Sequence, residues 1–152
     1  DVNRRLAHDV KESGRFMTLF YAEIDRLQGI IRWVNAGHDP AILFDPVKEK
    51  FEELNGGSNL ALGVMADSRY TEAQHEIASG QILVMATDGV WEARNNEGEM
   101  YGKDRLYKII RENTSATAAE IQTAVFESVR HFRNDTPLED DMTLVIVKVN
   151  ST

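Results

Sequence analysis

The sequence predicts an α+β fold, in which a layered antiparallel β-sheet structure is flanked by α-helices. Three observations support this class: an uninterrupted apolar run at residues 82–85, several short apolar segments separated by tight turns, and two later segments with helical periodicity. A short apolar run between turn residues is typical of a strand covered on both faces. The 152 residues are enough for one substantial core, so we interpret residues 1–152 as a single domain.

The composition excludes several classes of protein and site. No apolar run approaches the roughly 20 residues needed to span a bilayer, and there are no cysteines to form disulfides or thiolate metal sites. The absence of cysteine fits a cytoplasmic protein. The net charge of -8 argues against nucleic acid or an anionic membrane as a partner. A phosphate ligand would therefore need a cation held by some of the carboxylates.

The first half of the chain is predicted to contain one helix followed by strands. Val2, Leu6 and Val10 recur at helical spacing, and Gly14 stands where such a helix would end. Residues 16–24 are apolar and rich in aromatics, which predicts a buried strand. With strands at 30–35 and 41–44, joined by short turns, this strand would form an antiparallel meander. Further strands are expected near 51–54 and, half exposed, at 71–77.

The second half contains the central strand at 82–85 and two helices. Residues 103–113 are amphipathic, and Thr117 with Glu120 has the pattern of a capping box at the start of a second helix. That helix carries an apolar stripe along one side: Ile121, Ala124, Val125, Val129 and Phe132. Residues 142–149 are predicted to form a last buried strand.

Two of the predicted strands have acidic residues at one end. Asp88 comes just after the strand at 82–85, and Asp140 and Asp141 come just before the strand at 142–149. If these strands are antiparallel neighbours, the acidic ends meet at one edge of the sheet, where a shared divalent cation would relieve their repulsion. Two simpler interpretations remain open: Asp88-Gly89 is a common hairpin turn, and Asp140-Asp141 can be a solvated loop.

Other candidate groups have weaker support. His38 lies in a Gly-His-Asp-Pro turn, where turn capping explains it as well as a site role does. Ser58 lacks the surrounding elbow of a serine hydrolase, and Gly56-Gly57 lacks the lysine of a phosphate-binding loop. The remaining histidines are scattered along the sequence: His8, His75 and His131.

Five motifs, in order, resemble those of the metal-dependent serine/threonine protein phosphatases of the 2C-type or PPM class. Residues 87–93 are similar to the Asp-Gly motif of that class, and residues 140–144 to its terminal Asp-Asp-x-Thr motif. Residues 35–40, following 16–19, resemble the bacterial branch typified by the sporulation stage II protein E phosphatase. Two dipeptides complete the set: Leu62-Gly63 and Tyr101-Gly102. Together the motifs extend over nearly the whole chain.

The resemblance implies a central β-sandwich flanked by helices, with two Mn²⁺ or Mg²⁺ ions at one end. The ions would activate a water molecule that attacks phosphoserine or phosphothreonine directly. Asp88 and Asp140 match ligand positions and would be the catalytic metal ligands. Asp141 aligns with the neighbouring position of the terminal motif, and Gly89 would let its backbone approach the ions.

The resemblance also implies partners and a departure from the family pattern. The substrate would be a phosphorylated bacterial signalling protein such as an anti-anti-sigma factor, and a sensor or receiver domain would precede the phosphatase. The family's first acidic motif belongs upstream of residue 16 and is absent. We therefore interpret the chain as the C-terminal part of the domain without its first strands, which would bind metal poorly and expose an apolar sheet edge. The alternative function is a catalytically inactive phosphatase-fold binding module.

Overall fold

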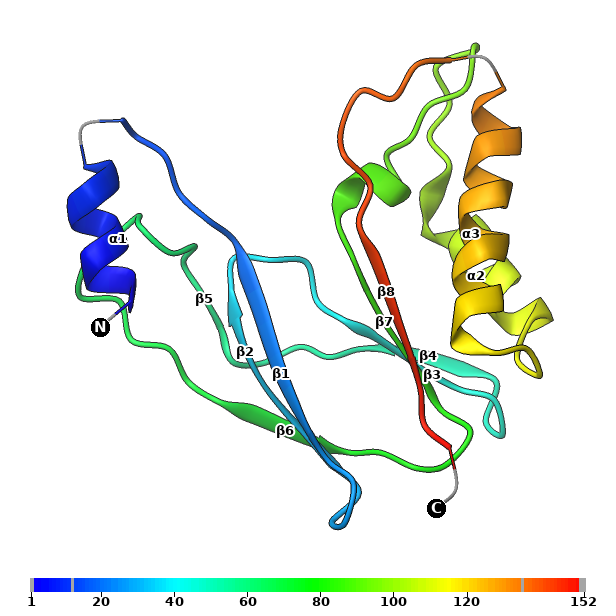
Figure 1. Ribbon diagram of the computed structural model, residues 1–152, viewed down its shortest axis with the longest axis horizontal. Coiled ribbons are helices and arrows are strands. Elements are labelled where there is room, and N and C mark those ends of the chain that lie inside the picture. The colour runs from blue at the N-terminus through cyan, green and yellow to red at the C-terminus, as the bar shows by residue number, and fades with distance from the viewer. Residues whose placement is uncertain (1, 12, 135, 151–152) are drawn as a thin grey trace. The chain divides into compact units, whose positions relative to one another are not determined.

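A computed structural model describes residues 2–11, 13–134 and 136–150 (Figure 1). The chain divides into two compact units: the first comprises Asp1–Pro40 and Leu54–Ala78, and the second comprises Ala41–Glu53 and Ser79–Thr152. Both units contain helix and antiparallel strands, so the predicted α+β class is confirmed. The interpretation of residues 1–152 as one domain stays a prediction.

The first unit contains a helix and a four-stranded sheet. Its elements are α1 (Val2–Val10), β1 (Leu19–Asp25), β2 (Ile30–Ala36), β5 (Ser58–Asn59) and β6 (Ala73–Glu76). β2 pairs antiparallel with β1 along its whole length and with β6, and it forms a short parallel ladder with β5. The helix predicted from Val2, Leu6 and Val10 is confirmed, as is the half-exposed strand within 71–77.

A buried asparagine attaches α1 to the loop that follows residue 62. The Asn3 side chain, only 7% exposed, donates from Nδ2 to the Met65 carbonyl (2.8 Å) and to the Ala66 carbonyl (3.2 Å). Its Oδ1 accepts from the Gly63 N–H at 2.9 Å. Buried polar groups are costly unless they are hydrogen-bonded, so these three bonds fix where the helix lies against the loop.

The prediction of a buried strand over residues 16–24 is wrong about burial. The strand begins at Leu19, and Phe16, Leu19 and Tyr21 are 63%, 42% and 59% exposed. β1 lies at one edge of its sheet, with β2 as its only strand partner among the described residues. Apolar and aromatic residues favour strand conformation, but they do not reveal whether a second layer covers the strand. The expected apolar exposure is therefore present on this strand.

The predicted meander of strands 16–24, 30–35 and 41–44 is confirmed for its first two strands, which pair antiparallel as β1 and β2, and is wrong for the third. β3 (Ile42–Asp45) belongs to the second unit, where it pairs with β4 (Lys50–Glu53) and β7 (Ile82–Ala86). The turn before it is held by the buried Asn35, whose side chain bonds both the N–H and the carbonyl of His38 at 2.9 and 2.8 Å. Gly37 has φ +71°, a conformation that favours glycine. A short connection thus leads the chain into a different sheet.

The second unit has a fully antiparallel sheet of order β4-β3-β7-β8, where β8 is Leu144–Lys148. A 3₁₀ turn at Asp88–Val90 follows β7, and two helices come between β7 and β8: α2 (Gly102–Glu112) and α3 (Ala118–Arg133). The capping box at α3 is confirmed, since Thr117 accepts from the Glu120 N–H and Glu120 accepts from the Thr117 N–H.

The core of the second unit lies between its sheet and these helices (Figure 1). α3 directs the predicted apolar stripe inward, and α2 contributes Leu106 and Ile110, which are fully buried. β7 is buried on nearly every residue, as predicted. β8 is only partly buried, because Leu144 faces the core at 4% exposure whereas Val145 is 44% exposed. None of the helices in the described ranges is long and apolar enough to cross a membrane.

We expect Ile110→Ala to lower the free energy of unfolding by about 2–5 kcal/mol, because it leaves a cavity in a fully buried position. The matched control is Val47→Ala, at a residue that is 89% exposed and whose truncation should change stability by no more than about 0.5 kcal/mol. Urea unfolding followed by circular dichroism measures both. Equal effects of the two substitutions would contradict the assigned core.

We also expect a pH-dependent contribution from Asp45 in the β3–β4 turn. The Lys48 backbone N–H, followed by the Gln81 side chain, holds the pKa of Asp45 below its ordinary value of 3.8. A lowered pKa stabilises the folded state above the ordinary value, and this contribution is lost as the pH falls through the lowered pKa. Asp45→Asn should therefore be less stable than wild type at neutral pH, with a difference that shrinks in acid. A difference in urea midpoint that is independent of pH would contradict this assignment.

Candidate active site at the end of strands β7 and β8

The pairing of β7 with β8 brings the acidic segments to one end of the sheet. The register runs from Ile82 opposite Lys148 to Ala86 opposite Leu144, so the last residue of β7 lies beside the first residue of β8 (Figure 1). Asp88 follows β7 by two residues, and Asp140 and Asp141 come shortly before β8. The prediction that these two strands are antiparallel neighbours is confirmed.

Thr87 extends this pairing beyond the strands themselves. Its backbone N–H donates to the Thr143 carbonyl at 3.1 Å. Its hydroxyl accepts from the Thr143 N–H at 2.9 Å and donates to the Asp141 carbonyl at 3.2 Å. One residue therefore holds the segment after β7 against the segment before β8, on the side where the acids lie.

Gly89 is placed so close to the opposite segment that a side chain would not fit. A Cβ atom built on Gly89 would lie 2.5 Å from the Asp141 carbonyl oxygen and 3.2 Å from its carbon. Glycine is required here for the close approach of two backbones. The Asp-Gly pair is thus more than a hairpin turn, because its glycine contacts the backbone of the terminal Asp-Asp segment.

Asp88 and Asp140 use only part of their hydrogen-bonding capacity locally. Asp88 opens the 3₁₀ turn, and its Oδ1 accepts from the Gly89 N–H at 2.9 Å. The Asp140 Oδ1 accepts from the Asp141 N–H at 2.7 Å. All three aspartates are solvent-exposed. An ionised carboxylate has about four acceptor positions, so both groups keep oxygens that a ligand can reach.

These donors suit a hard divalent cation only in part. Carboxylate and backbone oxygens are the ligands that Mg²⁺ and Mn²⁺ prefer. Within residues 2–11, 13–134 and 136–150, however, no three His, Asp or Glu side chains lie close enough together to hold a metal ion. To hold an ion, the acids at this end would need further oxygen donors. Their role as metal ligands stays a prediction.

A small cavity of about 130 Å³ adjoins the acidic segments. Gly89 and Asp140 line it together with Arg94, on the loop after the 3₁₀ turn, and Arg133, the last residue of α3. Neither arginine is predicted from the sequence. They lie far apart in the chain, and no motif or spacing connects them with Asp88 or Asp140.

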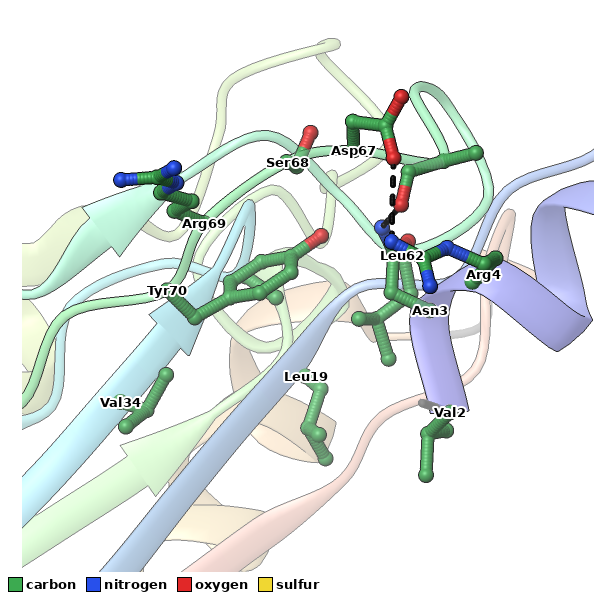
Figure 2. A pocket seen from close by; sticks show the side chains of 12 residues that line it. Val2, Asn3, Arg4, Leu19, Val34, Leu62, Asp67, Ser68, Arg69 and Tyr70 are labelled. Atoms are coloured by element: carbon green, nitrogen blue, oxygen red, sulfur yellow. Dashed lines mark hydrogen bonds and ion pairs between the residues drawn. The ribbon is translucent and has the colours of Figure 1, made fainter.

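Of the other candidate groups considered from the sequence, His131 lies on α3, and the rest lie in the first unit. His38 has its ring Nδ1 2.9 Å from the Asp39 carbonyl, and its backbone is bonded to Asn35, as a turn residue would be. A wider pocket of about 650 Å³ lies beside α1 (Figure 2). Figure 2 shows Arg4 and Asp67 at this pocket, joined by an ion pair of 3.2 Å whose side chains are both largely exposed.

The sequence matches the family described as stage II sporulation protein E (SpoIIE) over residues 1–150. It is 28% identical over 148 residues to phosphoserine phosphatase RsbU of Bacillus subtilis, covering 97% of this chain and 43% of RsbU. It is 30% identical over 148 residues to protein IcfG of Synechocystis, covering 97% of this chain and 23% of IcfG. The chain thus spans less than half the length of these curated relatives.

Two solved structures have the same fold. The SiaA-PP2C domain of Pseudomonas aeruginosa superposes with a TM-score of 0.75 at 17% identity, covering 98% of this chain and 68% of that domain. The phosphatase domain of SpoIIE from Bacillus subtilis, in crystals presoaked with Mn, gives a TM-score of 0.68 at 16% identity, covering 100% and 75%. The match over residues 1–150 and this likeness of fold agree with the motifs. The chain belongs to the family described as stage II sporulation protein E (SpoIIE).

Proposed function

We propose that this chain is part of a Mn²⁺- or Mg²⁺-dependent protein phosphatase that hydrolyses phosphoserine or phosphothreonine on a regulatory protein. The observation that carries the proposal is the β7–β8 pairing, which gathers Asp88, Asp140 and Asp141 at one end of the sheet. The relative RsbU is named as a phosphoserine phosphatase, which supports the same reaction. Because the chain spans less than half of its curated relatives, the activity is proposed for the intact protein that contains it.

The acidic end supplies the protein's part of the chemistry. The carboxylates of Asp88 and Asp140 would hold the ions, with Asp141 and the Gly89 backbone beside them. When bound, Mn²⁺ or Mg²⁺ would act as a Lewis acid on the phosphoryl group and activate the attacking water. Thr87 and Gly89 would keep the two acid-bearing segments at a fixed separation, so that the carboxylates need little rearrangement when an ion binds.

We further propose that the substrate is a phosphorylated signalling protein, such as an anti-anti-sigma factor, and that a sensor or receiver domain regulates the intact enzyme in the cytoplasm. The family match and the name of RsbU support this proposal.

The alternative is a catalytically inactive binding module. The partial set of acids at this end favours it, because the described residues contain no complete cluster of metal ligands. A Mn²⁺-dependent assay of the intact protein on a phosphoserine protein separates the two functions.

Chelation and a single substitution test the metal role. We expect EDTA to abolish phosphatase activity and Mn²⁺ to restore it. Asp88→Asn should lower the restored activity by roughly 100-fold or more, since even outer-shell changes cost about 10–100-fold in metal sites. The thermal unfolding midpoint of this variant should be unchanged or slightly higher, because one of several like charges has been removed.

The matched control is Asp104→Asn, which removes the same charge in the first turn of α2 and should keep full activity. Activity of Asp88→Asn near wild type in saturating Mn²⁺ would exclude Asp88 as a ligand.

The close approach at Gly89 gives a second test. Gly89→Ala places a methyl group where the Asp141 carbonyl lies, so the ends of β7 and β8 must separate. We expect a destabilisation of about 1–3 kcal/mol and a higher Mn²⁺ concentration for half-maximal activity. Gly98→Ala is the comparison for stability loss alone: Gly98 has φ +80°, so alanine there strains the backbone although its Cβ meets no atom within 4 Å. We expect it to leave the Mn²⁺ requirement unchanged. A Mn²⁺ requirement that Gly89→Ala leaves unchanged would show that the spacing of the two segments does not matter for metal binding.

A further inference from the structure

We propose that Arg133, with Arg94 beside it, binds the phosphate group of the substrate in the cavity next to Asp140. This inference rests on the proposed phosphatase function and adds to it a substrate-binding residue. It starts from one guanidinium nitrogen without a hydrogen-bond partner, on an arginine that lines the cavity beside the acidic end.

The cavity combines three segments of the second unit. Gly89, Glu92 and Arg94 come from the chain after β7, Arg133 comes from the end of α3, and Glu139 and Asp140 come from the segment before β8. In Figure 1 the loop around residues 94–100 and the segment that follows α3 rise to the same end of this unit. The ion pair of Arg94 with Glu139, at 3.8 Å, joins two of the three segments.

Arg133 has one buried donor without a hydrogen-bond partner among the described residues. Its Nη2 donates to the Thr136 carbonyl, yet its Nε is buried and has no hydrogen-bond partner. Among the residues that the structure describes, no carboxylate forms an ion pair with it. A buried donor without an acceptor is unfavourable. An anion that binds this guanidinium and lets it reorient would supply the hydrogen bond that Nε lacks.

Arg94 is only weakly paired with its acidic neighbour, Glu139. Its Nη1 donates to the Gly98 carbonyl at 2.8 Å, and the distance of 3.8 Å between its Nε and the Glu139 carboxylate is beyond hydrogen-bond length. The Arg94 side chain is 38% exposed and that of Glu139 is 72% exposed. An exposed pair of this kind contributes little and can be exchanged for a better acceptor.

The charge and the size of the cavity favour a phosphate group. A guanidinium presents a planar fork of N–H donors that matches two oxygens of a phosphate. The volume of about 130 Å³ admits a small anion rather than a large organic ligand. The whole chain has a net charge of -8 and would repel a phosphoprotein. Local arginines beside the acidic end would supply the attraction that the rest of the surface does not.

The experiment measures phosphate binding and catalysis in the intact protein with Arg133→Met and Arg133→Lys. Arg130→Met is the matched control, because Arg130 is exposed on the same helix and carries the same charge. For Arg133→Met we expect the KM for a phosphoserine protein and the inhibition constant of inorganic phosphate to rise roughly tenfold or more, with a smaller change in kcat. Arg133→Lys should fall between, since a lysine keeps the charge but not the fork. Arg130→Met should stay within about twofold of wild type.

Binding of inorganic phosphate alone, followed by calorimetry, separates this proposal from the proposed function. If the intact protein shows no phosphatase activity but loses phosphate binding in Arg133→Met and not in Arg130→Met, the phosphate site stands and the enzymatic function fails. If phosphate binds Arg133→Met as tightly as wild type, the site is overturned whatever the activity. Thermal unfolding checks that each variant folds. Should Arg133→Met fail to fold, Arg133→Lys decides, since wild-type phosphate affinity there would show that the guanidinium fork is not used.

Discussion

The antiparallel pairing of β7 with β8 is the constraint on which the candidate site depends. Neither Asp88 nor the Asp140-Asp141 segment lies within a strand, so their proximity is determined by what holds the strand ends together. Two small residues do this work. The Thr87 hydroxyl serves as donor to one backbone group and acceptor from another, and Gly89 has no Cβ to keep the Asp141 carbonyl away. The buried faces of β7 and α3 then fix the sheet beneath them.

The sequence predicted those elements whose defining pattern lies within a few consecutive residues. The run at 82–85 has no polar residue to place outward, which favours a covered strand with Asp88 just beyond its end. The capping box at Thr117 was equally clear, because its two side-chain bonds are formed within four residues. The pairing of β7 with β8 was a condition of the predicted site, because no local pattern determines which strands are neighbours.

The sequence did not predict features that depend on a segment's neighbours in space, such as the burial of a strand or the choice of its partner. Residues 16–24 contain the residues of a covered strand, yet Tyr21 is largely exposed, because cover is a property of the neighbouring layer. Strand β3 follows β2 after a short turn but belongs to another sheet, since the length of a turn does not choose a strand's partner. Arg94 and Arg133 meet at one cavity only through the path of the chain around α2 and α3, and no local pattern records that path.

The position of β8 in the chain has a consequence for how the protein is made. β7 is synthesised before α2 and α3, whereas its partner on the acidic side comes after both helices. During translation, β7 can pair at first only with β3, and its other edge stays open until β8 leaves the ribosome. The end of the sheet that Asp88 follows is therefore the last part of this unit to be completed. A nascent chain stalled before Asp140 would carry Asp88 without the segment that faces it. One edge of the apolar strand β7 would then be unpaired, and a chaperone would need to shield it.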